Sequence, residues 1–162
     1  MAAIGVEGPA APPNADADAP PFTITGQPGY RIYCSLEEKQ AVIDRLQAAG
    51  VIPATLDDAR LVRIENGKPR YGEDILETTL PQESEQMHAV SFNKGCYLGQ
   101  EIVERIRARG HVNRHFRKLE LDAPEPPAPG TKLTVDGKDS EITSAVYSPA
   151  QGRVIALAYV RG

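Results

Sequence analysis

The amino-acid sequence predicts an α+β fold, in which an antiparallel sheet carries helices on one face and a small C-terminal β-barrel follows. Within residues 22–112, short β-branched and aromatic runs alternate with helical segments that have clear start and stop signals. Residues 113–162 contain only strand-like runs, separated by glycine turns and a proline-rich link. We therefore expect an α+β domain over 22–112 and a barrel domain over 113–162. A residual strand and a flexible Ala/Pro-rich segment precede them, in residues 1–21.

The first predicted strands lie near the N-terminus. Residues 2–6 have the composition of a short strand, whereas residues 8–21 consist almost entirely of Ala, Pro, Asp, Asn and Gly, which cannot bury a face. A Gly/Pro break at residues 26–29 is then flanked by β-branched and aromatic residues. This pattern predicts a β-hairpin formed by residues 22–25 and 30–34.

Two helices follow the predicted hairpin. Residues 35–38, Ser-Leu-Glu-Glu, form a capping box ahead of a helix that Gly50 ends. A second helix is expected from about Leu56 to Glu65, with Thr55 as its N-cap residue. Between the two helices, residues 51–52 are predicted as a third strand.

The second half of the chain contains one long loop, one helix and several strands. Residues 69–81 show weak periodicity and many polar groups, and a stretch of this length without regular structure indicates a functional loop. A short amphipathic helix is predicted to begin near Leu98 or Gly99. The remaining predicted strands are residues 116–121, 131–135, 141–147 and 154–160.

Composition excludes several classes of protein. The chain has 162 residues, of which 41% are hydrophobic and 25% charged, as in soluble globular proteins. A net charge of -4 argues against a nucleic-acid or anionic-membrane surface. No stretch approaches the roughly 20 apolar residues of a membrane span, and the start lacks the features of a signal peptide. We expect a cytoplasmic protein that binds small molecules or proteins, with Cys34 and Cys96 as free thiols.

The chemically most distinctive stretch is residues 94–101, Lys-Gly-Cys-Tyr-Leu-Gly-Gln-Glu. Cys96 lies just before the predicted helix, where unpaired N–H groups and the helix dipole stabilise an anion, and Lys94 is two residues away. Both features favour a thiolate, so Cys96 and Lys94 are candidate catalytic residues. The alternative is a small apolar cysteine that fills a glycine turn, and the residues alone leave both explanations open.

The segment 94–118 is basic and contains two histidines. Its Lys and Arg side chains would suit phosphate groups or polyglutamate carboxylates, although a solvated helix face is the commoner explanation. His111 and His115 have a spacing found in metal sites. However, Gly110 precedes them and no third ligand is nearby, so no metal site is predicted.

Residues 94–101 match the K-G-C-Y-x-G-Q-E signature of the YgfZ family. These are folate-binding proteins of iron–sulfur cluster maintenance, related to the glycine cleavage system T protein, an aminomethyltransferase. Arg105 and Arg109-Gly110 match residues that usually follow the signature. From Phe22 onward, nearly the whole chain resembles this family. The other matching blocks, in order, are 26–30, 63–75, Thr143-Ser144 with Ser148-Pro149, and 155–160.

The resemblance implies a T-protein-like fold around a folate channel, with tetrahydrofolate or a one-carbon derivative as the cofactor. By position, Glu65 would pair with the pterin N–H donors, unless it is a surface acid at a helix end. Tyr71 would pack near the ring, with ordinary core packing as the alternative. Cys96 corresponds to the cysteine that separates this family from the T protein itself, which implies iron–sulfur client or assembly proteins as partners. Further candidate folate contacts are Lys94, Tyr97 and Arg105.

Family members have a large N-terminal region before the point where this chain starts. The chain therefore resembles the C-terminal part of a longer protein, or one half of a split protein whose N-terminal half is a separate partner. The aspartate that the T protein uses for folate chemistry lies in that region, so we expect the chain by itself to bind folate weakly or not at all. The leading prediction is a tetrahydrofolate-binding accessory protein for iron–sulfur cluster assembly or repair. The alternatives are an aminomethyltransferase-type enzyme and a basic-patch RNA-binding module.

Overall fold

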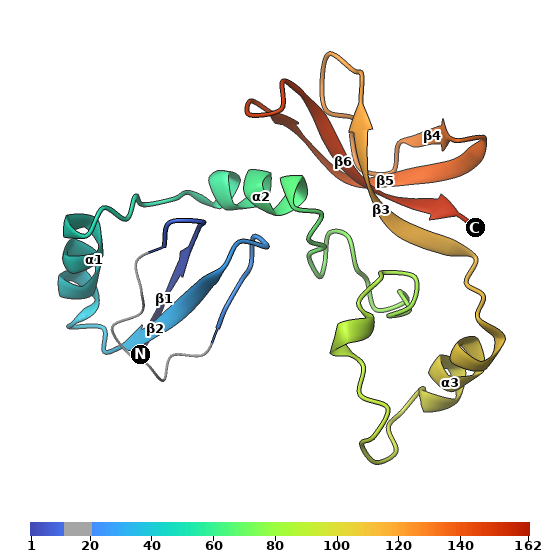
Figure 1. Cartoon of the computed structure of the whole chain (residues 1–162), viewed down its shortest axis with the longest axis horizontal. Coiled ribbons are helices and arrows are strands. Elements are labelled where there is room, and N and C mark those ends of the chain that lie inside the picture. The colour runs from blue at the N-terminus through green and yellow to red at the C-terminus, as the bar shows by residue number, and fades with distance from the viewer. Residues whose placement is uncertain (12–20) are drawn as a thin grey trace. The chain divides into compact units, whose positions relative to one another are not determined.

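The computed structural model describes residues 1–11 and 21–162, apart from the side chain of Arg109. The described chain divides into two compact units, Met1–Lys68 (unit 1) and Pro69–Gly162 (unit 2). Figure 1 shows the helices and strands of each unit. Most of the flexible segment predicted in the first 21 residues lies outside the described residues. The domain boundaries predicted from the sequence stay predictions.

Unit 1 contains a two-stranded antiparallel sheet and two helices. β1 (Ala2–Glu7) pairs with β2 (Gly29–Cys34), in a register that places Ala2 opposite Cys34 and Glu7 opposite Gly29. The helices are α1 (Lys39–Ala48) and α2 (Leu56–Glu65). Alternate strand residues point to one face, where the sheet packs on α1. The buried core of this face consists of Val6, Tyr30 and Leu46.

The hairpin predicted between residues 22–25 and 30–34 is wrong in its first strand. The partner of β2 is β1, and residues 22–25 instead bend around the carboxylate of Glu7. The backbone N–H groups of Ile24 and Thr25 donate to this carboxylate at 2.7 and 2.9 Å, and the Thr25 hydroxyl donates at 2.6 Å. Near the start of this segment, Pro21 forms an isolated bridge with Tyr30 and the Phe22 N–H donates to the Gly29 carbonyl at 3.0 Å. The N–H groups of Ile24 and Thr25 are bonded to Glu7 and cannot extend this pairing into a strand.

The third strand predicted at residues 51–52 is also wrong. The Val51 N–H donates to the Leu46 carbonyl at 3.0 Å, so this residue completes the end of α1. Ile52 is 85% exposed and contributes nothing to a sheet. Two consecutive β-branched residues favour a strand. Here the Val51 N–H instead bonds to the last turn of α1.

The predicted cap formed at α2, whereas at α1 the Ser35 box lies ahead of the helix, whose N-cap residue is Glu38. At α2, the Asp58 N–H donates to the Thr55 hydroxyl at 3.1 Å, and the Thr55 N–H donates to the Asp58 carboxylate at 2.8 Å. Ser35 and Glu38 make the same reciprocal bonds at 3.2 and 3.1 Å. However, the regular part of α1 begins only at Lys39, because the residues after Ser35 form a turn.

Unit 2 contains a long irregular segment, one α-helix and a curled four-stranded antiparallel sheet (Figure 1). The strands lie in the order β3-β6-β5-β4, which confirms the strand-only tail that the sequence predicts. The sheet is an open half-barrel. The elements, in chain order, are the short 3₁₀ helix η1 (Met87–Ala89), α3 (Gln100–Arg109), β3 (Arg114–Leu121), β4 (Lys132–Val135), β5 (Lys138–Ser148) and β6 (Arg153–Arg161).

Two local features shape this sheet. Asp136 and Gly137 both have positive φ, 51° and 78°, as a two-residue hairpin turn between β4 and β5 requires. In β5, the pairing with β6 shifts between Ile142 and Ser144, which marks Thr143 as a bulge. A bulge bends its strand and increases the local twist. The central strand β6 is buried at each position from Val154 to Val160 and supplies much of the core.

Candidate functional site

Residues 94–99 form the loop that leads into α3, and Gln100 and Glu101 are the first two residues of that helix, close to the start that the sequence predicts. Gly99 is the N-cap residue of α3 and has a left-handed conformation, with φ of 87°. The N–H groups of Ile102 and Val103 donate to the Gly99 carbonyl at 3.1 and 3.4 Å. Glycine adopts this conformation without the steric cost that a side chain would add. The chain therefore turns sharply into the helix directly after the cysteine-containing loop.

Three predicted site residues lie together in this loop. Cys96 is exposed and is a free thiol, as is Cys34. The Lys94 ammonium nitrogen lies 4.7 Å from the centre of the Tyr97 ring, a distance at which a cation is attracted to the ring face. Tyr97 is half-buried. The loop thus presents an accessible sulfur and, two residues earlier in the chain, a cation that lies over an aromatic ring.

The other predicted site residues lie elsewhere in the two units. Arg105 is exposed on α3. Tyr71 is 67% exposed in the irregular segment of unit 2, so core packing does not account for it. Glu65 belongs to unit 1, where it is the half-buried last residue of α2.

The basic segment makes several contacts within unit 2. The Arg107 guanidinium lies 4.1 Å from the Phe92 ring centre and 3.4 Å from the Glu104 carboxylate. His115 contacts the Glu85 carboxylate at 2.8 Å through Nδ1. In the part of the chain that the structure describes, no group of three or more His, Cys, Asp or Glu residues is arranged to hold a metal ion. Likewise, none of the described helices is long and apolar enough to cross a membrane.

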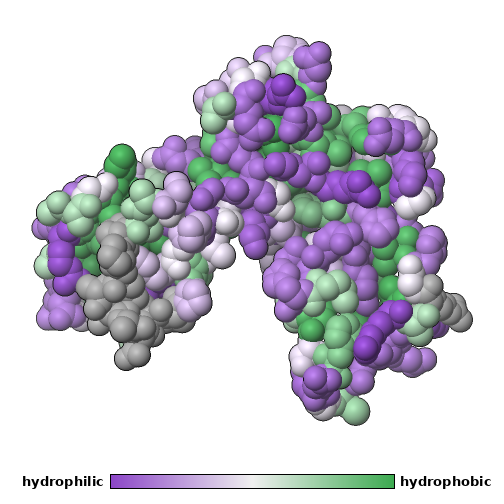
Figure 2. Space-filling model, viewed as in Figure 1, coloured by the Kyte–Doolittle hydropathy of each residue, from purple (hydrophilic) through white to green (hydrophobic). Residues whose placement is uncertain are grey.

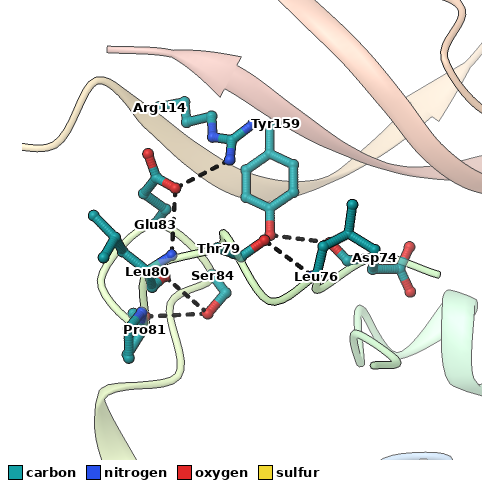
Figure 3. Close-up of polar contacts among 9 residues, drawn as sticks. All are labelled: Asp74, Leu76, Thr79, Leu80, Pro81, Glu83, Ser84, Arg114 and Tyr159. Carbon is teal, nitrogen blue, oxygen red and sulfur yellow. Dashed lines mark hydrogen bonds and ion pairs between the residues drawn. The ribbon is translucent and has the colours of Figure 1, made fainter. Parts of the chain in front are cut away.

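Asp74 is the centre of a buried hydrogen-bond network in unit 2, and no site role was predicted for it from the sequence. This residue is only 1% exposed, and its Oδ1 accepts hydrogen bonds from the hydroxyls of Thr143 and Ser144, both at 2.6 Å. Its Oδ2 accepts from the Arg70 N–H at 2.9 Å. The Tyr159 hydroxyl donates to the Asp74 backbone carbonyl at 3.1 Å (Figure 3). The carboxylate therefore joins the irregular segment to the sheet.

The bulge in β5 explains how two neighbouring side chains reach one oxygen atom. Successive residues of a regular strand point to opposite faces of the sheet. Because the pairing shifts at Thr143, its hydroxyl and that of Ser144 both reach Asp74. In the sequence, Asp74 and Thr143-Ser144 belong to two separate matching blocks. A local match of this kind does not reveal a contact between residues that are distant along the chain.

Tyr159 lies beside this centre on β6. Burial raises the pKa of its hydroxyl, and the Glu83 and Asp74 charges act in the same direction, while the Thr79 hydrogen bond and the Arg114 charge act against it. The Arg114 guanidinium carbon lies 4.4 Å from the Tyr159 ring centre (Figure 3). Two hollows of about 480 and 200 Å³ open next to these side chains, and Arg114, Glu141 and Tyr159 line both of them. A neutral phenol and a guanidinium recognise polar ligands and supply no nucleophile.

Figure 2 shows mainly hydrophilic residues on the visible face, with apolar residues between them. The large exposed apolar side chains of unit 2 include Leu98, in the loop two residues after Cys96, and Ile102, in the first turn of α3. Leu98 is fully exposed. The surface around Cys96 is therefore partly apolar as well as basic.

No family model matches the chain. Over 84% of its length, however, it is similar to proteins named aminomethyltransferase. It is 33% identical over 137 residues to the one from Stenotrophomonas maltophilia, 32% over 138 residues to that from Rippkaea orientalis, and 30% over 139 residues to that from Staphylococcus carnosus. The chain spans only 37%, 37% and 38% of the length of these three relatives.

A solved structure has the same fold. The glycine cleavage system aminomethyltransferase T from Bartonella henselae superposes with a TM-score of 0.73 at 22% sequence identity. The match covers 86% of this chain and 40% of that structure. The α+β fold predicted from the sequence is thereby confirmed as that of the corresponding part of an aminomethyltransferase.

Proposed function

We propose that this chain forms the C-terminal part of a tetrahydrofolate-binding protein of the aminomethyltransferase type. The observation that carries the proposal is the similarity to aminomethyltransferases over 84% of the chain, together with the shared fold. Because the chain spans 37% of the S. maltophilia relative, we propose that the rest of the folate site comes from an N-terminal polypeptide, fused or separate. One-carbon transfer then belongs to the assembled protein.

Within this chain, we propose Glu65 as a folate contact. It ends α2, a helix whose start is fixed by the capping box of Thr55 and Asp58. A carboxylate on a rigid helix can accept two neighbouring N–H groups of a pterin ring in bidentate fashion. The remaining folate contacts that we propose, from the family resemblance, are Tyr71, Lys94, Tyr97 and Arg105.

Calorimetric titration with tetrahydrofolate tests this proposal. We expect weak or no binding to the chain alone, and clear binding when the in-frame upstream region, or a separately encoded N-terminal half, is supplied. In the assembled protein, Glu65→Gln should weaken binding about tenfold or more, since hydrogen bonds to charged groups contribute about 1.5–3 kcal/mol. Glu37→Gln, at an exposed acid of the same unit, is the control. Tight binding by the chain alone, or none by the assembled protein, would contradict the proposal.

A specific observation favours a second function, support of iron–sulfur proteins. Cys96 is accessible in a loop that matches the YgfZ signature, with the Lys94 ammonium group held over Tyr97. Replacing the sulfur separates the two functions. Under the iron–sulfur proposal, Cys96→Ala abolishes the recovery of cluster enzymes in a complementation assay, whereas Cys34→Ala does not. Under one-carbon transfer alone, neither substitution changes folate chemistry.

A further inference from the structure

Residues 80–86 of unit 2 form a compact turn that we call the 80–86 turn. The N–H groups of Glu83 and Ser84 donate to the Leu80 carbonyl at 3.0 and 3.1 Å, and the buried Ser84 hydroxyl donates to the Pro81 carbonyl at 3.2 Å. Glu85 has φ of 58°, a left-handed conformation that is uncommon for a residue with a side chain. The turn thus has a specific, closely bonded conformation.

One side of the 80–86 turn is bonded to the first residues of β3. The Phe116 N–H donates to the Glu83 carbonyl at 2.8 Å, and the Arg114 guanidinium donates to the Glu83 carboxylate at 3.1 Å (Figure 3). His115 contacts the Glu85 carboxylate at 2.8 Å. Three consecutive residues of β3 therefore hold the turn against the edge strand of the sheet.

The other side of the turn is bonded to α3 through the side chain of Gln82. The Gln82 amide nitrogen donates to the Val103 carbonyl, in the first turns of α3, at 3.1 Å. Val103 is also the one buried residue of α3 among its described side chains, at 7% exposure, whereas Ile102 is 44% exposed. The Gln82 hydrogen bond therefore reaches α3 at its buried residue, Val103.

The other end of the Gln82 amide is unusual. Its Oε1 is buried and has no hydrogen-bond partner among the described residues. A buried oxygen without a partner is unfavourable, so Gln82 destabilises the fold at this atom while its nitrogen makes the contact with α3. An apolar side chain of similar length would avoid that cost but would lose the hydrogen bond.

We infer that Gln82 is a positioning residue, which holds α3 and the preceding loop, residues 94–99, in a fixed place relative to the sheet. The path runs from β3 through the 80–86 turn to Gln82, and from there to the Val103 carbonyl. The functional meaning of this placement rests on the role proposed above for the cysteine-containing loop. The placement itself can be tested without any ligand.

Hydrogen–deuterium exchange of the full chain tests the placement. Gln82→Met removes the donor, keeps the length of the side chain and removes the unpartnered oxygen. The matched control is Gln86→Met, because the partner of the Gln86 side-chain amide among the described residues is the Ser84 carbonyl within the same turn, at 3.0 Å, and not a residue of α3. In Gln82→Met, we expect amides of residues 100–109 to exchange about two- to tenfold faster, the range for one net hydrogen bond. Exchange in β5 and β6 should stay unchanged in both variants.

A second readout reports on the loop. A fluorophore attached to Cys96, in a chain with Cys34→Ser, should show lower anisotropy in Gln82→Met than in Gln86→Met. In Gln82→Asn, the side chain is one methylene shorter, so its amide cannot reach the Val103 carbonyl. This variant should behave like Gln82→Met and replaces it in both measurements if Gln82→Met does not fold. Equal α3 exchange and equal anisotropy in the Gln82 and Gln86 variants would overturn the inference. If the Gln82 variants loosen α3 but still complement cluster enzymes fully, the positioning role stands and the iron–sulfur role of the loop fails.

Discussion

Asp74 shows how one buried carboxylate fixes an irregular segment. Its Oδ1 accepts hydrogen bonds from two hydroxyls of β5, and its Oδ2 accepts one from a backbone N–H of the irregular segment itself. Buried charges are tolerated when hydrogen bonds replace the lost water, and here both carboxylate oxygens have partners. The long loop predicted from weak periodicity is therefore held in place by specific polar contacts.

Asp74→Asn should lower the free energy of unfolding of unit 2 by about 2 kcal/mol or more, since it replaces charge-assisted bonds with weaker ones. The new Nδ2 group, if it takes the place of Oδ2, also faces the Arg70 N–H, so that two donors oppose each other. Urea denaturation followed by circular dichroism measures the loss. Asp139→Asn, at an acid that is 82% exposed, should change stability by less than about 0.5 kcal/mol. Equal effects of the two substitutions would show that burial of Asp74 contributes nothing.

Glu7 gives unit 1 a dependence on pH. Partial burial acts to raise the pKa of its carboxyl, but the hydrogen bonds from Thr25, Ile24 and Thr23 outweigh it and lower the pKa below the ordinary value of 4.5. A group with a lowered pKa stabilises the fold at pH values above its unfolded pKa, and this contribution is lost as pH falls through its folded pKa. The residues around Glu7 should therefore loosen in acid.

Urea denaturation near pH 6 and near pH 3 tests this prediction. We expect the loss of unit 1 stability between the two conditions to be smaller in Glu7→Gln than in the unsubstituted chain. Glu38 and Asp58 also have a lowered pKa, from their caps, so part of the pH dependence remains in every variant. Glu37→Gln is the control and should keep the full dependence. The prediction fails if Glu7→Gln behaves like that control.

At the scale of the element, helices and local turns could be predicted from the sequence, and long-range pairing could not. The start and end of α2 follow from Thr55, Asp58 and the glycine after its end, all within one short stretch. β2 instead pairs with β1, which lies more than twenty residues earlier and has an ordinary apolar composition. Local composition does not reveal which distant strands pair or in what register. The prediction therefore took the nearer residues 22–25 as the partner of β2, which was wrong.

The same limit applies to the candidate site. The sequence pattern placed Lys94, Cys96 and Tyr97 in one loop before a helix, because signal and structure are both local there. Asp74 and Gln82 were missed, because their roles depend on contacts with residues that are distant in sequence. A glutamine in a loop carries no pattern that reveals a buried amide.

Gly29 tests the close approach of β1 and β2. A Cβ atom added to Gly29 would lie 2.3 Å from the Val6 carbonyl oxygen and 2.9 Å from the Glu7 Cα, both backbone atoms that cannot move aside. Gly29→Ala should therefore cost about 1–3 kcal/mol in unfolding free energy, as other forced overpacking does. Gly95→Ala is the matched control, because nothing lies within 4 Å of its added Cβ. If both variants unfold at the same urea concentration, β1 and β2 do not approach each other closely at Gly29.

At the scale of the whole molecule, the two units differ in how much core they possess. The sheet of unit 1 packs around three buried residues, Val6, Tyr30 and Leu46, and two-stranded sheets are marginal without further partners. In unit 2, the central strand β6 is buried over seven consecutive positions, from Val154 to Val160. The chain spans 37% of the length of its S. maltophilia relative, and we expect the N-terminal polypeptide proposed above to pack on unit 1.

We therefore expect the two units of the isolated chain to lose structure separately. In hydrogen–deuterium exchange at increasing urea, peptides that contain β1, β2 and α1 should lose protection at lower urea than peptides from β5 and β6. Supplying the N-terminal polypeptide should raise the urea concentration at which unit 1 opens and leave that of unit 2 nearly unchanged, since a partner that binds only the folded state stabilises what it contacts. Loss of protection in all peptides at one urea concentration would instead show that the 162 residues unfold as a single cooperative structure.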